Sequence, residues 1–338
     1  MRPLRWILLG GAAAIALSAG ALLYYLSRPL PLPEPVECWV APGSSISQAV
    51  RTTAHCCRAD APELLVLLAR VYATLSGAQL YAGPYRFGPE HRHWQLLYAL
   101  FSGKQVARVW VTIPEGLTLW QIASLLAQRA GVDSAEFVRW AHTPALLQEF
   151  GISAASAEGY LFPSTYELFW RHRAEDVVRR LLRAQQRLWA ARFDSLARQR
   201  GLSRHEVLTL ASIIEAETPH PDERRRVSGV LYNRLRRGLP LQADPTVAYA
   251  LGKSGTLLSR QDLRVEHPYN TYRVRGLPPG PINNPGADAI SAALEPEEHN
   301  YLYFVLRRDG SRRHIFSRSY KEHLQAIASQ QRTYPATP

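Results

Sequence analysis

Cysteine is scarce in this chain of 338 residues, which has only Cys38, Cys56 and Cys57. An odd number with two adjacent members does not make a disulfide framework, although Cys38 could pair with either Cys56 or Cys57. No zinc-ligand spacing accompanies these cysteines. The sequence also lacks a P-loop, a dinucleotide-binding fingerprint and a Ser-His-Asp order. We therefore expect neither a metal nor a cofactor.

Acidic residues are outnumbered by basic ones, 28 against 40, which gives a net charge of +12. The excess is almost all arginine, because lysine occurs only at Lys104, Lys253 and Lys321. Nucleic acid is a common partner of basic proteins, but these arginines are dispersed and no nucleic-acid motif appears, so we do not expect it as a partner. A cell wall or an anionic lipid surface would suit the same charge.

The amino terminus contains an uncharged run, Trp6 to Leu26, of about the length that crosses a bilayer. Arg2 and Arg5 precede this run, which places the short tail in the cytoplasm and the remaining chain outside it. Small residues around Ser18 leave a cleaved signal peptide as the alternative. We expect a retained single-pass anchor in the inner membrane, with the body of the protein in the periplasm.

The remaining chain mixes helical and strand patterns, which predicts an α+β fold. The expected divisions are a tail and transmembrane anchor at 1–27, a proline-rich spacer at 28–37, an N-terminal α/β region at 38–145, a C-terminal α+β domain at 146–330 and a disordered tail at 331–338. Within the N-terminal region, a strand at Val109–Ile113 is followed by a Pro-Glu-Gly turn. A helix then begins near Leu117, with Thr118 as its cap.

A second helix is predicted at Ser203 to Thr218, where apolar residues recur at helical spacing and Ser203 with Glu206 forms a capping box. It ends in Glu215 and Glu217, just before prolines that forbid continuation. At 100° per residue these two carboxylates lie about 200° apart, so both cannot point into one cleft. The negative end of the helix dipole disfavours their ionised form. This suits a general acid, although solvated charges at a helix end would look the same.

Several long strings follow in a fixed order: ASIIEAET, then Glu223 to Gly252 with LYNRLRRGLPLQADPTVAYALG, then Tyr269 to Leu294 with YNTYRVRGLPPGPINNPGADAISAAL. In these strings the chain resembles the YceG-like family, the membrane-anchored endolytic murein transglycosylases known as MltG. The resemblance covers most of the second half and, more weakly, the first half. In the family the catalytic acid directly precedes the threonine of E-x-E-T, which corresponds to Glu217. Glu215 is then a supporting or purely structural member of the pair.

The resemblance also implies a LysM-like β-α subdomain at the strand and helix around Thr118, which either binds glycan or only braces the catalytic part. Its C-terminal domain would be the YceG-like catalytic domain. Other residues of the quoted strings could offer hydrogen bonds or rings to sugars, although turn chemistry explains the same residue types. The candidate substrate-binding residues are Gln242, Asp244, Thr246, Tyr269, Asn270, Tyr272, Asn283 and Asn284.

The implied reaction cleaves the MurNAc–GlcNAc bond of nascent peptidoglycan strands, leaves 1,6-anhydro-MurNAc ends and terminates strand elongation. One protonated Glu is sufficient for this chemistry, whereas a hydrolase needs two carboxylates. The expected partners are peptidoglycan strands, the membrane and cell-wall synthesis proteins. Two alternatives remain: a muramidase with Glu217 as acid and Asp244 or Glu215 as base, and a non-enzymatic glycan-binding scaffold.

Overall fold

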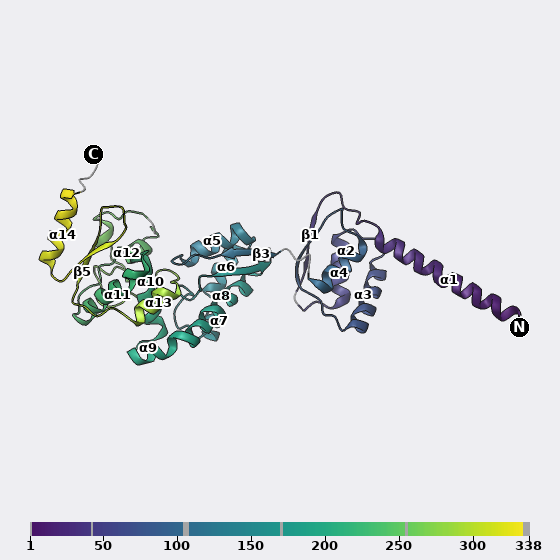
Figure 1. The fold of residues 1–338 in the computed structure, drawn as a ribbon, viewed down its shortest axis with the longest axis horizontal. Coiled ribbons are helices and arrows are strands. Elements are labelled where there is room, and N and C mark those ends of the chain that lie inside the picture. The colour runs from purple at the N-terminus through teal and green to yellow at the C-terminus, as the bar shows by residue number, and fades with distance from the viewer. Residues whose placement is uncertain (1, 42, 104–107, 170–171, 254–255, 334–338) are drawn as a thin grey trace. The chain divides into compact units, whose positions relative to one another are not determined.

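The computed structural model describes residues 2–333 except 42, 104–107, 170–171 and 254–255. These residues form helices and three two-stranded sheets, β1 with β2, β3 with β4 and β5 with β6 (Figure 1). The mixture confirms the α+β class. The chain divides into two compact units. The N-terminal unit is Met1–Val109 with Glu167–His172, and the C-terminal unit is Trp110–Tyr166 with Arg173–Pro338.

The N-terminal unit combines helices with one two-stranded antiparallel sheet, whose strands are separated in the chain by two of the helices. Its elements are α1 (Arg2–Ser27), β1 (Val36–Val40), α2 (Ile46–Cys56), α3 (Pro62–Ser76), β2 (Gly83–Phe87) and α4 (His93–Ser102). β1 and β2 are antiparallel, with Val36 opposite Phe87. Tyr85 and Phe87 of β2 lie in one buried core with Leu65 of α3 and Leu96 of α4. Burial of these large apolar side chains is the main stabilising contribution to this unit.

The cysteines join the first strand of this unit to its first short helix. Of the two pairings that the sequence leaves open, the structure has Cys38 bonded to Cys56, while Cys57 is a free, buried thiol. Burial raises the pKa of Cys57 to about 12. The proline-rich segment expected as a spacer lies against the same unit, because Leu30 and Leu32 are buried in its core.

The predicted transmembrane helix at Trp6 to Leu26 is wrong, and with it the single-pass anchor and the inner-membrane location. Among the residues that the structure describes, no helix combines the length and the apolar character needed to cross a bilayer. The end of α1 instead packs on protein. Tyr25 and Leu26 contact the buried core of the N-terminal unit, and the Tyr25 ring lies 4.7 Å from that of His93. The uncharged run therefore includes residues whose apolar surface is covered by the unit itself.

The C-terminal unit is mostly helical. Its elements, with the strand pair β3–β4 that joins it to the other unit along the chain, are β3 (Arg108–Thr112), α5 (Leu119–Ala130), α6 (Ser134–Ala141), α7 (Pro144–Glu149), β4 (Thr165–Phe169), α8 (Ala174–Leu188), a π-helical turn (Trp189–Phe193), α9 (Asp194–Arg200), α10 (Arg204–Glu217), α11 (Pro221–Arg236), α12 (Asp244–Ala250), a 3-10 turn (Asp262–Arg264), α13 (Ala287–Leu294), β5 (Tyr303–Leu306), β6 (His314–Ser317) and α14 (Tyr320–Thr333). The tail expected from residue 331 falls, beyond Thr333, outside the described residues.

Helix α10 is the centre of this unit. All residues from Val207 to Ile214 are buried, so the helix is covered on every side and not only on one apolar face. It packs against α11, α12 and α13, which surround it in the fold (Figure 1). A helix enclosed in this way is held rigidly by its neighbours, and groups at its end are placed with little freedom.

The β-α segment that precedes these helices is close to its expected form. β3 is followed by the turn at Gly116, and α5 begins after Thr118, whose side chain accepts a hydrogen bond from the N–H of Gln121. The Gln121 side chain accepts one from the N–H of Thr118 in return, which completes a capping box. Glycan binding by this LysM-like segment stays a prediction.

Candidate active site

The two carboxylates of interest lie at the end of α10. The helix begins at the predicted capping box, in which Ser203 accepts from the N–H of Glu206 and the Ser203 N–H donates to the Glu206 carboxylate at 2.8 Å. It ends at Glu217, because Thr218 is extended and Pro221 starts the next helix. Glu215 and Glu217 therefore occupy the last turn, as the sequence predicts.

Glu215 is held by the protein. One oxygen accepts from Arg224 Nη2 at 2.6 Å and the other from the N–H of Gly286 at 3.0 Å. Both members of the ion pair are largely buried, each with a side chain 7% exposed. Burial raises the pKa of Glu215, whereas the Gly286 N–H and the charge of Arg224 oppose that rise. This carboxylate connects α10 to α11 and to the segment before α13, so its contacts are structural.

Glu217 is in a different environment. Its residue is half-buried, and in the part of the chain that the structure describes no group donates a hydrogen bond to its carboxyl. Burial is the largest cause that raises its pKa, and the negative charge of Asp244 adds to it, which brings the pKa to about 8. The carboxyl is therefore mostly protonated at neutral pH and can donate that proton.

The residue after Glu217 is fixed by a buried pair. Thr218 is fully buried, and its hydroxyl donates to Glu223 at 3.5 Å. Glu223 also accepts from the N–H of His314 at 3.1 Å and lies 2.9 Å from its ring nitrogen Nδ1. His314 thus belongs to the framework that holds the chain after the carboxyl of Glu217.

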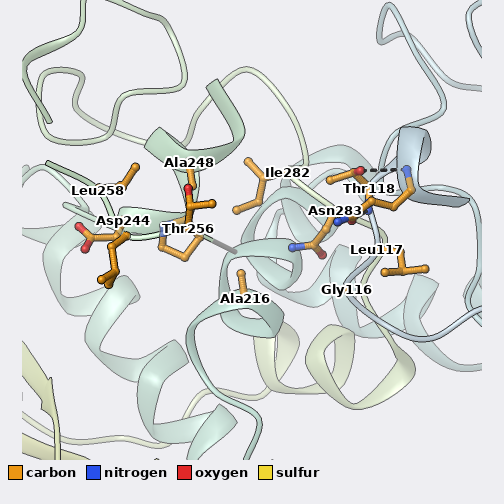
Figure 2. Close-up of a pocket in the computed structure, with 13 residues that line it drawn as sticks. Gly116, Leu117, Thr118, Ala216, Asp244, Ala248, Thr256, Leu258, Ile282 and Asn283 are labelled. Atoms are coloured by element: carbon orange, nitrogen blue, oxygen red, sulfur yellow. Dashed lines mark hydrogen bonds between the residues drawn. The ribbon is translucent and has the colours of Figure 1, made fainter. Parts of the chain in front are cut away.

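A cleft with a volume of about 390 Å³ lies at the end of α10, a size that accommodates a small ligand (Figure 2). Ala216, between the two carboxylates, lines it, whereas Glu215 and Glu217 themselves are not among its lining residues. In Figure 2 the labelled Asp244 and Asn283 lie on either side of Ala216. The other lining residues come from the start of the β-α segment, from α12 and from the two loops that flank α12 and α13: Gly116, Leu117, Thr118, Gln121, Pro245, Ala248, Thr256, Leu257, Leu258 and Ile282.

Of the predicted substrate-binding residues, Asp244 and Asn283 line this cleft. Asp244 is exposed and accepts a hydrogen bond from the hydroxyl of Tyr272 at 2.5 Å. Asn283 donates to the carbonyl of Ser212 at 2.8 Å, while its side-chain oxygen is buried without a hydrogen-bond partner among the described residues. These two side chains contribute polar groups to the wall of the cleft.

The remaining predicted residues lie outside the lining of the cleft. Thr246, Asn270 and Asn284 are fully buried. The hydroxyl of Thr246 donates to Ala243, and the amide of Asn270 donates to two backbone carbonyls in the loop before it.

The other three members of the set are more open to solvent. The Tyr269 ring packs 5.1 Å from that of Tyr249, and exposed Gln242 accepts from Arg234. Tyr269 to Tyr272 form turns, in which the Asn270 side chain accepts from the N–H of Tyr272 and closes the chain locally.

One carboxyl near the cleft is not among the residues that the sequence singles out. Glu158 is 4% exposed and accepts hydrogen bonds from Leu119, Asn284 and Tyr249. Burial raises its pKa to about 7, against the lowering effect of those donors. Only a Glu-Gly pair before an aromatic string marks this position in the sequence, and that pattern does not indicate a buried acid.

Among the described residues, no group of three or more His, Cys, Asp or Glu side chains is placed to hold a metal ion.

An α+β unit that holds a protonated carboxyl at the end of a buried helix, beside a cleft, has the features of an enzyme that works by general acid catalysis. The chain belongs to the YceG-like family, whose model matches residues 39–329. A crystal structure of a yceG-like protein from Listeria monocytogenes has a similar fold, with a TM-score of 0.60 and 30% identity over 87% of this chain and 99% of that one.

Curated relatives carry one name. An endolytic murein transglycosylase of Bacillus subtilis (strain 168) is 34% identical in an alignment of 251 residues that covers 68% of this chain and 68% of the relative. An endolytic murein transglycosylase of Streptococcus pneumoniae (serotype 2, strain D39) is 33% identical in an alignment of 220 residues that covers 58% of this chain. The match spans only 40% of that streptococcal protein.

Proposed function

We propose that this protein is an endolytic murein transglycosylase, a lyase that cleaves peptidoglycan strands, and that Glu217 is its proton donor. Family membership and the relatives' activity support the reaction class. The observation that carries the choice of residue is the half-buried Glu217, whose pKa is raised to about 8 next to a cleft of about 390 Å³. Glu215 is engaged with Arg224 and Gly286, and it is not free to donate.

The proposed reaction needs one carboxyl in two protonation states. Glu217 gives its proton to the glycosidic oxygen that leaves from C1 of the MurNAc residue, and an oxocarbenium-like centre develops at C1. The resulting carboxylate takes the proton of the C6 hydroxyl as O6 bonds to C1, which closes a 1,6-anhydro ring. No water is consumed, and Glu217 returns to its protonated form. The negative charge of Asp244 raises the pKa of Glu217 and would stabilise the positive charge that develops at C1.

We assign Asp244 and Asn283 to substrate contact because both line the cleft. Tyr272 would orient Asp244 through its hydroxyl. Gln242, Thr246, Tyr269, Asn270 and Asn284 would act by holding the loops around the cleft. We also propose that cleavage terminates the elongation of nascent strands close to cell-wall synthesis proteins, as the family resemblance implies.

A muramidase is the second candidate, because Asp244 is an exposed carboxylate on the same cleft and could activate a water. The products separate the two reactions. Intact murein is digested with the wild-type protein, with Glu217→Gln and with Glu215→Gln, and the muropeptides are analysed by mass spectrometry and borohydride labelling. A transglycosylase leaves anhydro ends that borohydride does not label, lighter by one water than the reducing ends of a hydrolase.

Each outcome of this digestion has a clear meaning. Anhydro ends from the wild-type protein and none from Glu217→Gln would support the proposal. Reducing ends would establish the muramidase. The absence of fragments from the wild-type protein would favour a glycan-binding scaffold, and equal loss in Glu215→Gln and Glu217→Gln would refute the choice of acid.

A further inference from the structure

Glu158 does not line the cleft, but its carboxyl contacts three segments that do. Its two oxygens lie 3.0 and 3.1 Å from the N–H of Leu119, the first residue of α5. One oxygen accepts from the side-chain amide of Asn284 at 2.8 Å. The other accepts a longer bond from the hydroxyl of Tyr249 on α12, at 3.4 Å. These donors are 39, 126 and 91 residues away in the sequence.

Each donor is next to a residue of the cleft wall. Leu119 follows Leu117 and Thr118, Asn284 follows Asn283, and Tyr249 follows Ala248; the preceding residues all line the cleft. The Asn284 segment is also bonded directly to the β-α segment. Its amide donates to the carbonyl of Leu117 at 3.0 Å, and its carbonyl accepts from the N–H of Gly116 at 2.9 Å.

Removing this carboxyl would therefore break the link to α12 through Tyr249 and the bonds to Leu119 and Asn284, although the direct hydrogen bonds between Asn284 and the residues 116–117 remain. A buried donor that loses its acceptor costs free energy, and the Asn284 amide would have to move to find another one. An active-site wall that moves by about 1 Å can cost on the order of a hundredfold in rate. Glu158 is buried, with 4% of the residue exposed, so its carboxyl is not available to the substrate.

We propose that Glu158 is a positioning residue of the transglycosylase site, whose acceptor oxygens hold the start of α5, the Asn284 segment and α12 at the separation that substrate binding needs. This inference rests on the proposed function, because it concerns the same cleft. It separates Glu158 from Glu217: the first shapes the cleft and the second donates the proton.

The test compares three substitutions of Glu158. Glu158→Gln keeps an acceptor oxygen for Leu119 and Asn284, and kcat/KM should stay within about threefold of wild type. Glu158→Ala removes the acceptor, and Glu158→Asp withdraws it by one methylene group. Both should lower kcat/KM about tenfold or more, mostly through a higher KM, because the substrate meets misplaced walls. Initial rates are measured on soluble, uncrosslinked glycan strands well below the melting temperature of each variant.

Asn233→Ala is the matched control. Asn233 is also a buried polar residue of this unit, 6% exposed, and its amide donates to the carbonyls of His299 and Tyr301 at 2.8 and 2.9 Å. It lies outside the cleft lining. Its loss should lower the melting temperature in the same way as that of Glu158→Ala, with kcat/KM within about threefold of wild type.

The outcomes separate this inference from the proposed function. If the wild-type protein forms no product, the proposed function fails and no kinetic comparison can be made. The positioning role is then tested by calorimetric binding of glycan strands to wild type, Glu158→Ala and Asn233→Ala. Equal affinities of the three proteins would overturn the positioning role. If the wild-type protein is active, equal kcat/KM in Glu158→Ala and Asn233→Ala would overturn it. If Glu158→Ala does not fold, Glu158→Asp is compared with Glu158→Gln, and equal kcat/KM values for these two variants would overturn the positioning role.

Discussion

Replacing Glu217 by glutamine should stabilise the protein at alkaline pH while it abolishes product formation. The folded protein keeps the proton on Glu217 up to pH about 8, whereas the unfolded chain releases it near the usual pKa of 4.5. The folded state therefore binds more protons between these values, and the free energy of unfolding of the wild type decreases as pH rises through the interval. Glutamine has no proton to lose, so the variant does not follow that decrease.

The size of the effect follows from the pKa. A rise from 4.5 to about 8 corresponds to at most about 5 kcal/mol, at about 1.4 kcal/mol for each pKa unit. Glu217 retains part of its surface in water, so we expect about 2 kcal/mol in practice. For a folded unit of this size, such a gain raises the melting temperature by roughly 4 to 8 °C.

The assay is thermal unfolding of wild type and Glu217→Gln between pH 5 and pH 9, measured by scanning calorimetry. The two proteins should melt alike near pH 5, and the difference should grow towards pH 8 and then remain constant. Glu136 is the control carboxyl, because it is exposed and the hydrogen bond from Arg139 lowers its pKa; its substitution by glutamine should give no gain that grows with pH. Identical melting temperatures of wild type and Glu217→Gln at pH 9 would refute the claim that burial raises the pKa of Glu217.

Three further changes test neighbouring groups. Glu215→Gln removes the charge partner of buried Arg224 and should destabilise the protein by about 2 to 4 kcal/mol in denaturant unfolding, yet leave measurable transglycosylase activity; a stable but inactive variant would contradict this. Asp244→Asn removes the charge that adds to the pKa of Glu217, so the alkaline limb of the pH profile of kcat/KM should move to lower pH, and an unmoved limb would count against this coupling. Leu257, fully exposed on the cleft rim, should tolerate serine within about 0.5 kcal/mol while KM rises, and an unchanged KM would place the rim outside the substrate path.

Local signals in the sequence were sufficient wherever a structure depends on nearby residues. The capping box of Ser203 and Glu206, the cap at Thr118 and the end of α10 before the prolines all involve partners within a few positions. The position of Glu217 in the last turn follows from the same signals. Its assignment as the acid needed the family resemblance, because helical spacing alone does not distinguish it from Glu215.

Long uncharged runs and polar strings were less informative, because burial depends on what packs against them. The run at Trp6 to Leu26 reads as a bilayer span, yet its last residues contact the core of the N-terminal unit. Asn270 and Thr246 look like sugar-binding groups, but their side chains hold the backbone of neighbouring loops. Composition cannot show which acceptors a buried amide or hydroxyl meets.

The order of residues alone was enough for the α+β class, the family and the helix that ends in two carboxylates. Only the packing of distant segments distinguished those carboxylates, by placing Arg224 and Gly286 against Glu215, whereas none of the described residues donates a hydrogen bond to Glu217, which feels the charge of Asp244. It also brought Glu158 to donors 39 to 126 residues away. A carboxyl's protonation state depends on burial and on the charges around it, and both are properties of the folded chain.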